Sequence, residues 1–317
     1  MDRVPRALLA TLLVVLALAG CGVRAQTPPP PLPEPGPSEV ARQETALAAR
    51  RLAEGARLLA DATVDERLYA VLEQLSLDAE AHLAALGGVH EDGPAEEDDE
   101  EAPPVPTPDE LLAELTGSAD AALRAAVSLE DGALAQLLVV VAGSRLLAAE
   151  DLARRAGLER PRPAVLDAPT VRPEGVPGSR LAAMALAEDQ ARFGLELLAA
   201  RSEGDRRERA AREAARHERA SQAWADLAGS DPRRIAYALE GADAPEGDLR
   251  MLAARLESAL VTGYAALVPE AAPGSRAELA ALHLRAARAA RGWGASLGPL
   301  PGLEVDLATQ GASSVEG

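Results

Sequence analysis

Two titratable side chains interrupt the apolar faces of two neighbouring helices, which the sequence predicts over 179–202 and 205–228. Glu188 falls within the apolar series of the first helix, and His217 falls within that of the second. Glu213 lies four residues before His217, so the two share a helix face and could chelate a metal ion. A buried carboxylate needs a partner or a raised pKa. We therefore expect Glu188, Glu213 and His217 to meet in the interior, with Arg192 as a candidate counter-ion.

Two more candidate ligands stand on the next two helices, which the sequence predicts over 245–268 and 275–297. Glu257 and His283 lie at the edges of the apolar stripes of these helices. The four helices together thus offer at least one carboxylate or imidazole each. We expect Glu257 and His283 to lie nearer to the Glu188 cluster than any residue of the first half of the chain does.

The elements that must position these residues are helices throughout, so the fold class is predicted to be all-α. Apolar residues recur three and four apart, and helix-start signals such as Thr107-Pro108-Asp109-Glu110 precede several stripes. Residues 38–160 are predicted to form an N-terminal helical bundle of four helices, 38–61, 63–86, 107–129 and 131–156, with an acidic loop at 89–106. A Pro-rich linker at 161–178 leads to a second antiparallel bundle at 179–303, and 304–317 is a flexible tail.

The second bundle contains a connection, 229–244, that is longer than a turn between two helices needs. Ile235, Tyr237 and Leu239 are its apolar side chains, and we expect them to hold it against the bundle. Asp205 with Glu208, and Ser275 with Glu278, repeat the pattern of a capping residue followed by an acid.

Composition excludes several classes of function. The 317 residues carry a net charge of −18 and contain no Lys, which argues against nucleic acid as a partner and rules out a phosphate-loop or Schiff-base Lys. The chain has one Cys, so disulfides within it and thiol catalysis are excluded. Motifs of α/β-hydrolases, zincins and dinucleotide-binding enzymes are missing as well. We therefore expect no catalytic residues.

The start of the chain predicts where the protein resides. Arg3 and Arg6 precede an apolar run at 7–19 that is long enough for a signal peptide and too short to span a bilayer. The run ends in Leu18-Ala19-Gly20-Cys21, which resembles a bacterial lipobox. The resemblance implies that residues 1–20 are removed, that a lipid on Cys21 anchors the protein to the outer face of the cell membrane, and that the Pro-rich residues 21–37 form a tether.

A wider resemblance covers about 179–303. It is carried by the segment 186–202, the crossover 234–239, the run 252–257 with Tyr264, and the close 288–303 with Trp293 and Pro301-Gly302. Together they resemble a ferritin-like domain of unknown function found in actinobacterial lipoproteins and secreted proteins. The resemblance implies a ferritin-like four-helix bundle, and with it a possible site for iron or manganese. In ferritin-like di-iron proteins, two helices each give one Glu and two each give Glu-x-x-His.

This chain departs from that pattern. Glu213 and His217 are four residues apart instead of three, and Ala280 stands where a Glu should precede His283. We therefore favour a degenerate site without a cofactor, in a non-enzymatic lipoprotein that binds another component of the cell envelope. The alternative is a divergent di-iron or single-metal protein, with ligands among Glu188, Glu213, His217, Glu257 and His283, that acts in redox chemistry or metal storage.

Overall fold

The structure, a computed structural model, describes residues 35–90, 104–163, 166–241 and 246–303. Over these ranges the chain forms eight α-helices and one short 3-10 helix and contains no strand, which confirms the all-α prediction. The predicted signal peptide, Cys21, most of the tether, the acidic stretch 91–103 and the tail 304–317 lie outside the described residues.

The N-terminal half consists of two helical hairpins. They are α2 (Pro37–Ala62) with α3 (Glu66–Ala85), and α4 (Pro108–Ala126) with α5 (Gly132–Ala156). The hairpins pack together through α2 with α4 and α3 with α5. Helix α5 is long and apolar enough to cross a membrane, but 67% of its most apolar window is buried inside the protein, as expected for a core helix.

The C-terminal half repeats this plan with α6 (Gly178–Arg201), α7 (Gly204–Ala228), α8 (Glu246–Leu267) and α9 (Arg276–Trp293). Helices α6 and α7 form one hairpin and α8 and α9 the other, while α6 packs on α8. A 3-10 turn, Pro273–Ser275, precedes α9. Helix α9 ends four residues earlier than predicted because Gly294 adopts a left-handed φ of 100°, which stops the helix.

The helix starts agree only in part with the predicted caps. Thr107 and Glu110 form the predicted capping box, whereas Asp65 caps α3, a helix that we expected to begin at Thr63. The acid after Ser275 does not cap α9. Instead, the carboxylate of Glu278 accepts a hydrogen bond from the backbone N–H of Thr170 at 3.0 Å, and so holds the connection between the halves.

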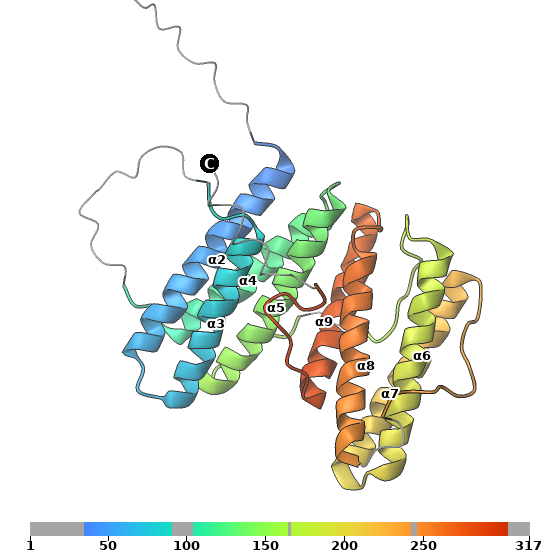
Figure 1. Ribbon diagram of the computed structural model, residues 1–317. Coiled ribbons are helices and arrows are strands. Elements are labelled where there is room, and N and C mark those ends of the chain that lie inside the picture. The colour runs from blue at the N-terminus through green and yellow to red at the C-terminus, as the bar shows by residue number, and fades with distance from the viewer. Residues whose placement is uncertain (1–34, 91–103, 164–165, 242–245, 304–317) are drawn as a thin grey trace, which may run out of the picture. The chain divides into compact units, whose positions relative to one another are not determined.

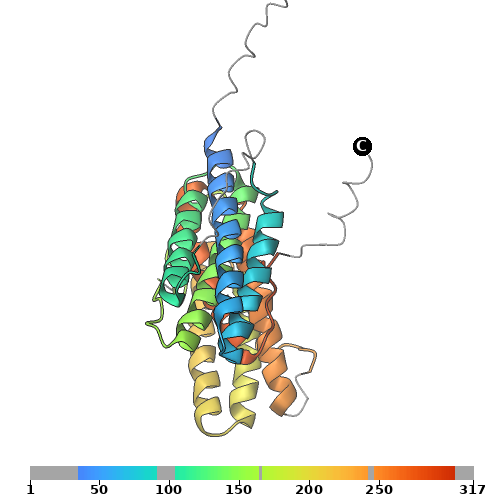
Figure 2. The same ribbon diagram turned by 90° about the vertical axis from the view of Figure 1, so that its left-hand side faces the viewer.

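The two halves share one hydrophobic core, in which α5 lies beside α9 (Figures 1 and 2). One cluster of buried residues includes Leu138 and Val139 of α5 together with Leu279 and Leu282 of α9. The described residues from Gly36 onward form one compact unit, so the Pro-rich linker joins halves that are in contact. The domain boundaries at 161–178 stay a prediction.

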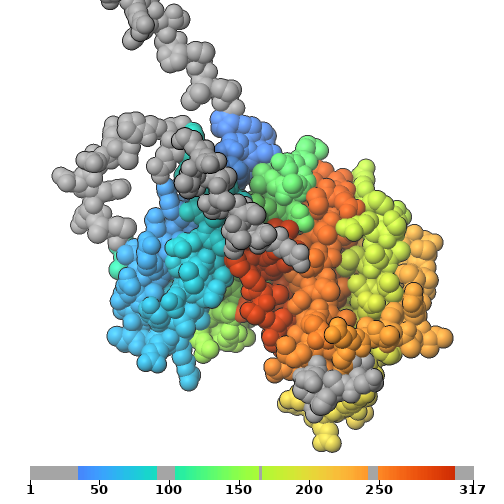
Figure 3. Space-filling view, viewed as in Figure 1, coloured from blue at the N-terminus to red at the C-terminus, as the bar shows by residue number. Residues whose placement is uncertain are grey.

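Two buried polar contacts reinforce this junction. The guanidinium of Arg276 donates to the carbonyls of Ala126 and Leu129 at the end of α4, and to those of Val268 and Ala271 after α8. The segment after α9 lies between α3 and α8, as Figure 3 shows, and the carbonyl of Pro299 lies 2.7 Å from Nε2 of His82. Residues of the first half thus hold both ends of α9.

Candidate functional site

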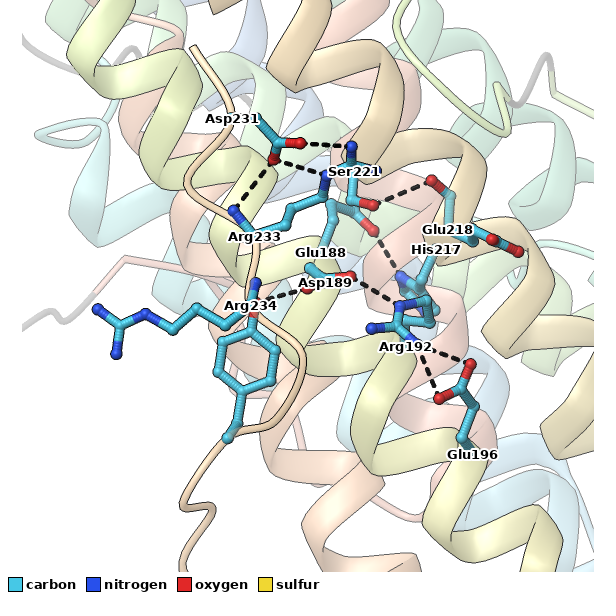
Figure 4. Close-up of polar contacts among 11 residues, drawn as sticks. Glu188, Asp189, Arg192, Glu196, His217, Glu218, Ser221, Asp231, Arg233 and Arg234 are labelled. Carbon is cyan, nitrogen blue, oxygen red and sulfur yellow. Dashed lines mark hydrogen bonds and ion pairs between the residues drawn. The ribbon is translucent and has the colours of Figure 1, made fainter.

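The site begins with His217 of α7, whose imidazole lies between two carboxylates. Its Nδ1 is 2.5 Å from Oε2 of Glu188 on α6, and its Nε2 is 2.8 Å from Oε1 of Glu257 on α8 (Figure 4 shows the first contact). All three side chains are fully buried. The sequence correctly predicted that Glu188 and His217 meet in the interior, and that Glu257 lies close to them.

A second cation completes the group. Arg285 of α9 donates from Nη2 to Oε1 of Glu188 at 2.8 Å, and the same oxygen accepts a hydrogen bond from the hydroxyl of Tyr264. The indole N–H of Trp224 donates to that hydroxyl at 3.2 Å. We call these six residues, Glu188, His217, Trp224, Glu257, Tyr264 and Arg285, the ion network. All four helices of the C-terminal half contribute to it.

Helices α6 and α8 contact each other beside the network. Gly263 of α8 lies against Met184 of α6, where an added Cβ would stand 2.9 Å from Sδ at the flexible end of that side chain. Tyr264 follows Gly263 directly, and Glu188 lies one helical turn after Met184. The contact therefore brings the Tyr264 hydroxyl onto the Glu188 carboxylate.

The network fixes the protonation of His217. Ionised carboxylates only accept hydrogen bonds, so an imidazole between two of them donates from both nitrogens and carries a proton. Burial alone lowers the pKa of His217, but Glu257 and Glu188 outweigh it and raise the pKa to about 9. Burial raises the pKa of Glu188, yet Arg285 and His217 overcome this and bring it to about 2. Two negative and two positive charges thus balance inside the bundle.

Glu213, which we expected in the cluster, and His283, a candidate ligand expected near it, have other partners. Glu213 accepts from Nε of Arg209 at 2.9 Å and from the indole of Trp293 at 2.5 Å, so its carboxylate is turned away from His217. His283 faces the first half: its Nε2 lies 3.0 Å from the carbonyl of Pro301, and its ring packs against Gly143 of α5. Glu213 thus holds the end of α9 through Trp293, and His283 packs α9 against α5.

The predicted counter-ion was also wrong. Arg192 pairs with Asp189 at 2.7 Å and with Glu196 at 2.7 Å, on the outer side of α6 (Figure 4). Arg285 takes the role expected of Arg192. Its position offered a signal that sequence reasoning missed, because it lies three residues after Leu282 and four before Ala289 on the inward face of α9.

The crossover between the hairpins is held from the same outer side. The hydroxyl of Tyr237 donates to Oδ2 of Asp189 at 2.5 Å, and Leu239 packs on the core, as expected. Ile235 does not take part: its side chain is fully exposed to solvent, contrary to the prediction. Glu188 therefore binds partners in the interior, whereas the adjacent Asp189 binds the crossover.

The alternative of an iron or manganese site does not fit this arrangement. A protonated imidazole has no lone pair for a metal, and the guanidinium of Arg285 already neutralises Glu188. Glu213 and His283, two of the five candidate ligands, are bound elsewhere. Among the described residues, no group of three or more His, Cys, Asp or Glu is arranged to hold a metal ion. What the network can do chemically is hold four helices together through buried charge.

A separate cleft opens where the two halves meet. It has a volume of about 610 Å³ and lies between α3, α5 and the segment after α9. Its lining includes the apolar side chains of Val71, Leu75 and Leu147, and charged groups of both signs: Glu66, Arg67, Asp78, Asp151, Arg155 and Arg291. Arg291 is paired with Asp151, and partial burial raises the pKa of Asp78. The cleft requires both halves of the chain.

Residues 181–305 match a family described as Domain of unknown function (DUF4439). The match covers the C-terminal half and contains every member of the ion network. No curated protein and no solved structure matches the chain. The match therefore assigns the C-terminal half to a recurring domain without assigning it a reaction.

Proposed function

We propose that the protein is a lipid-anchored, non-enzymatic helical protein of the cell envelope. In this proposal its C-terminal half is a ferritin-like bundle in which an internal ion network replaces the metal site. The protein then acts by binding another envelope component, and its buried charges serve as scaffold. Anchoring rests on Leu18-Ala19-Gly20-Cys21 and the basic and apolar stretches before it.

One observation carries the non-metal part of the proposal: both nitrogens of His217 are engaged by carboxylates. The contacts at 2.5 and 2.8 Å keep the imidazole protonated, and Arg285 supplies the second positive charge. A divalent cation at this place would have to displace a proton and a guanidinium that already balance both carboxylates. This supports a structural role for the site.

Metal analysis of the purified chain tests this part. We expect iron and manganese well below one equivalent per chain, in the wild type and in His217→Ala alike. Iron or manganese at near-stoichiometric levels, lost in His217→Ala, would instead establish the alternative of a metal-dependent redox or storage protein.

Membrane fractionation tests the anchor. Cys21→Ala should move the protein from the membrane fraction to the soluble extracytoplasmic fraction, because the lipid would have no attachment site. Retention of the Cys21→Ala variant in the membrane fraction would refute the lipoprotein assignment. The same experiment leaves the ion network untouched, so the two parts of the proposal can fail independently.

We place the partner in the cleft between α3, α5 and the segment after α9, because its lining combines apolar side chains with charged groups of both signs, which suits a polar partner chain. A photo-crosslinking residue at the exposed, cleft-lining position Ala70 should capture a partner in intact cells. The same residue at Ala211, exposed on α7 away from the cleft, is the matched control and should not. Equal capture at both positions would remove the cleft from the proposal.

A further inference from the structure

Helices α4, α5 and α9 leave an apolar pocket where the two halves of the chain meet, which we call the α4–α9 pocket. Its volume is about 340 Å³, within the range of pockets that hold small ligands. Leu123 and Val127 of α4, Val139 and Leu146 of α5, and Leu284 of α9 are among its lining residues. It shares no described lining residue with the cleft between α3, α5 and the segment after α9, so the two are separate.

Small residues of α5 and α9 create this space. Gly143 lines the pocket from α5, and Ala277, Ala280 and Ala281 line it from α9. Helix α9 lies close to α5 at this level, since a Cβ on Gly143 would stand 3.1 Å from the ring of His283. Towards α4, however, α9 presents only methyl groups, and these are too short to fill the space between the two helices.

Arg276 joins α4 and α9 at one end of the pocket. Its guanidinium donates hydrogen bonds to the carbonyls of Ala126 and Leu129, on either side of the lining residue Val127. The start of α9 is therefore tied to the end of α4 by buried hydrogen bonds. A pocket whose walls are fixed in this way is formed before a ligand binds, which lowers the cost of binding.

Two charged side chains of opposite sign line the pocket from α4. Asp120 and Arg124 lie one helical turn apart and are exposed, and neither side chain forms an ion pair or a hydrogen bond with another described residue. All other described lining residues are apolar or glycine. An apolar space with a few polar groups on its exposed side suits a small amphiphilic molecule.

The two charges restrict the polar head of such a molecule. A carboxylate head would pair with Arg124 but stand beside the like charge of Asp120, and an ammonium head would pair with Asp120 but stand beside Arg124. A hydroxyl group both donates and accepts hydrogen bonds. An uncharged head with hydroxyl groups therefore satisfies both side chains at once.

We propose that the α4–α9 pocket binds a single-chain lipid whose uncharged, hydroxyl-bearing head lies between Asp120 and Arg124. The acyl chain lies against Leu123, Val139 and Leu146, where removal of its methylene groups from water drives binding. The small volume selects one chain over two. The ion network, the cleft and Cys21 contribute no residue to this site, so the proposal stands or fails separately from the function proposed above.

Isothermal titration of the full chain with three ligands tests the proposal. Monodecanoylglycerol, decanoate and decylammonium share one acyl chain length and differ in the charge of the head. The chain carries Cys21→Ala, so that no lipid on Cys21 competes for the pocket. Below the micellar concentrations we expect one monodecanoylglycerol to bind per chain, about fivefold more tightly than either charged ligand, because a like charge about 4 Å away costs that factor in water.

Substitutions of the two charges should reorder the ligands. Asp120→Asn should make decanoate the tightest charged ligand, and Arg124→Gln should do the same for decylammonium. Ala281→Leu should weaken binding of all three ligands, because the longer side chain fills part of the pocket. Ala182→Leu is the matched control, since it enlarges an alanine of intermediate exposure on α6, outside the pocket, and it should leave the affinities unchanged.

Three results would overturn the proposal: no saturable binding, a wild type that does not prefer monodecanoylglycerol, or affinities that Ala281→Leu leaves unchanged. Thermal unfolding shows whether Ala281→Leu is folded. Should it fail to fold, the order of the ligands in Asp120→Asn and Arg124→Gln decides the question, because both substitutions are at exposed positions. An order that neither substitution changes would place the ligand elsewhere.

Discussion

Each half of the molecule buries a histidine and an arginine, but the groups that surround them differ between the halves. The C-terminal half encloses His217 and Arg285 together with two carboxylates, and His217 is protonated. The N-terminal half encloses His82 and Arg145 with backbone carbonyls alone among its described residues, and His82 is neutral. A histidine on an apolar stripe therefore does not reveal its charge. The side chains and carbonyls that other parts of the chain place around the histidine decide its charge.

The largest expected difference concerns the two arginines. Arg285→Met should lower the free energy of unfolding by about 3–5 kcal/mol, because it strands a buried carboxylate beside His217. Arg145→Met strands no opposite charge among the described residues and should cost far less, or even stabilise the protein. Urea unfolding measures both. Equal losses in the two variants would show that the carboxylates do not distinguish the halves.

A second prediction concerns alkaline pH. The pKa of His217 is raised from 6.5 to about 9, so its contribution is complete below about 6.5 and is lost as pH rises through 9. The wild type should lose about 3 kcal/mol of stability over this range. The His217→Gln variant should be less stable than the wild type at neutral pH, but its free energy of unfolding should not change over this pH range. A profile that is equally steep in the variant would assign the alkaline loss to another group.

The acidic side should report on the N-terminal half. The pKa of His82 is lowered from 6.5 to about 4, so the unfolded chain binds this proton more readily than the folded one. Stability should therefore fall as pH drops below about 6.5, by about 2 kcal/mol at pH 5, and His82→Gln should remove that share. Burial also lowers the pKa of His283, so some acid loss should remain. If His82→Gln left the acid profile unchanged, His82 would not be neutral in the folded state.

The smallest difference is expected at two helix glycines. A Cβ on Gly143 of α5 would lie 3.1 Å from the ring of His283, which the carbonyl of Pro301 holds in place. On Gly263 of α8 it would meet the flexible end of Met184. Gly143→Ala should therefore cost about 1–3 kcal/mol from crowding, against a gain of about 1 from helix propensity. Gly263→Ala should change the stability less. Thermal unfolding of the two variants measures this, and a larger loss in Gly263→Ala would show that Met184 is the more rigid neighbour.

Most of the fold could be predicted from the sequence, because helix periodicity and the glycine and proline breaks are local. The eight predicted helices match the observed ones to within a few residues at most ends. The meeting of Glu188 and His217 was predictable for the same reason, since both interrupt apolar stripes of helices joined by a short turn.

The buried arginines could not be predicted so easily. Arg285 and Arg145 lie on inward faces, but an Arg on such a face often extends to solvent, and only the tertiary packing shows that these two do not. Glu213 lies on the same helix face as His217 and still turns towards Arg209 of its own helix and Trp293 of α9, because the direction of a side chain depends on the partners around it.

Arg276 has a consequence for how the chain can be divided. The sequence match begins at residue 181, yet the guanidinium of Arg276 within it donates hydrogen bonds to carbonyls at the ends of both α4 and α8. Cutting the chain at the edge of the match would uncover the carbonyls at the end of α4 and leave a charged group in the exposed face of α9. We therefore expect the unit that folds cooperatively to be larger than the matched segment, so that both halves unfold in a single transition.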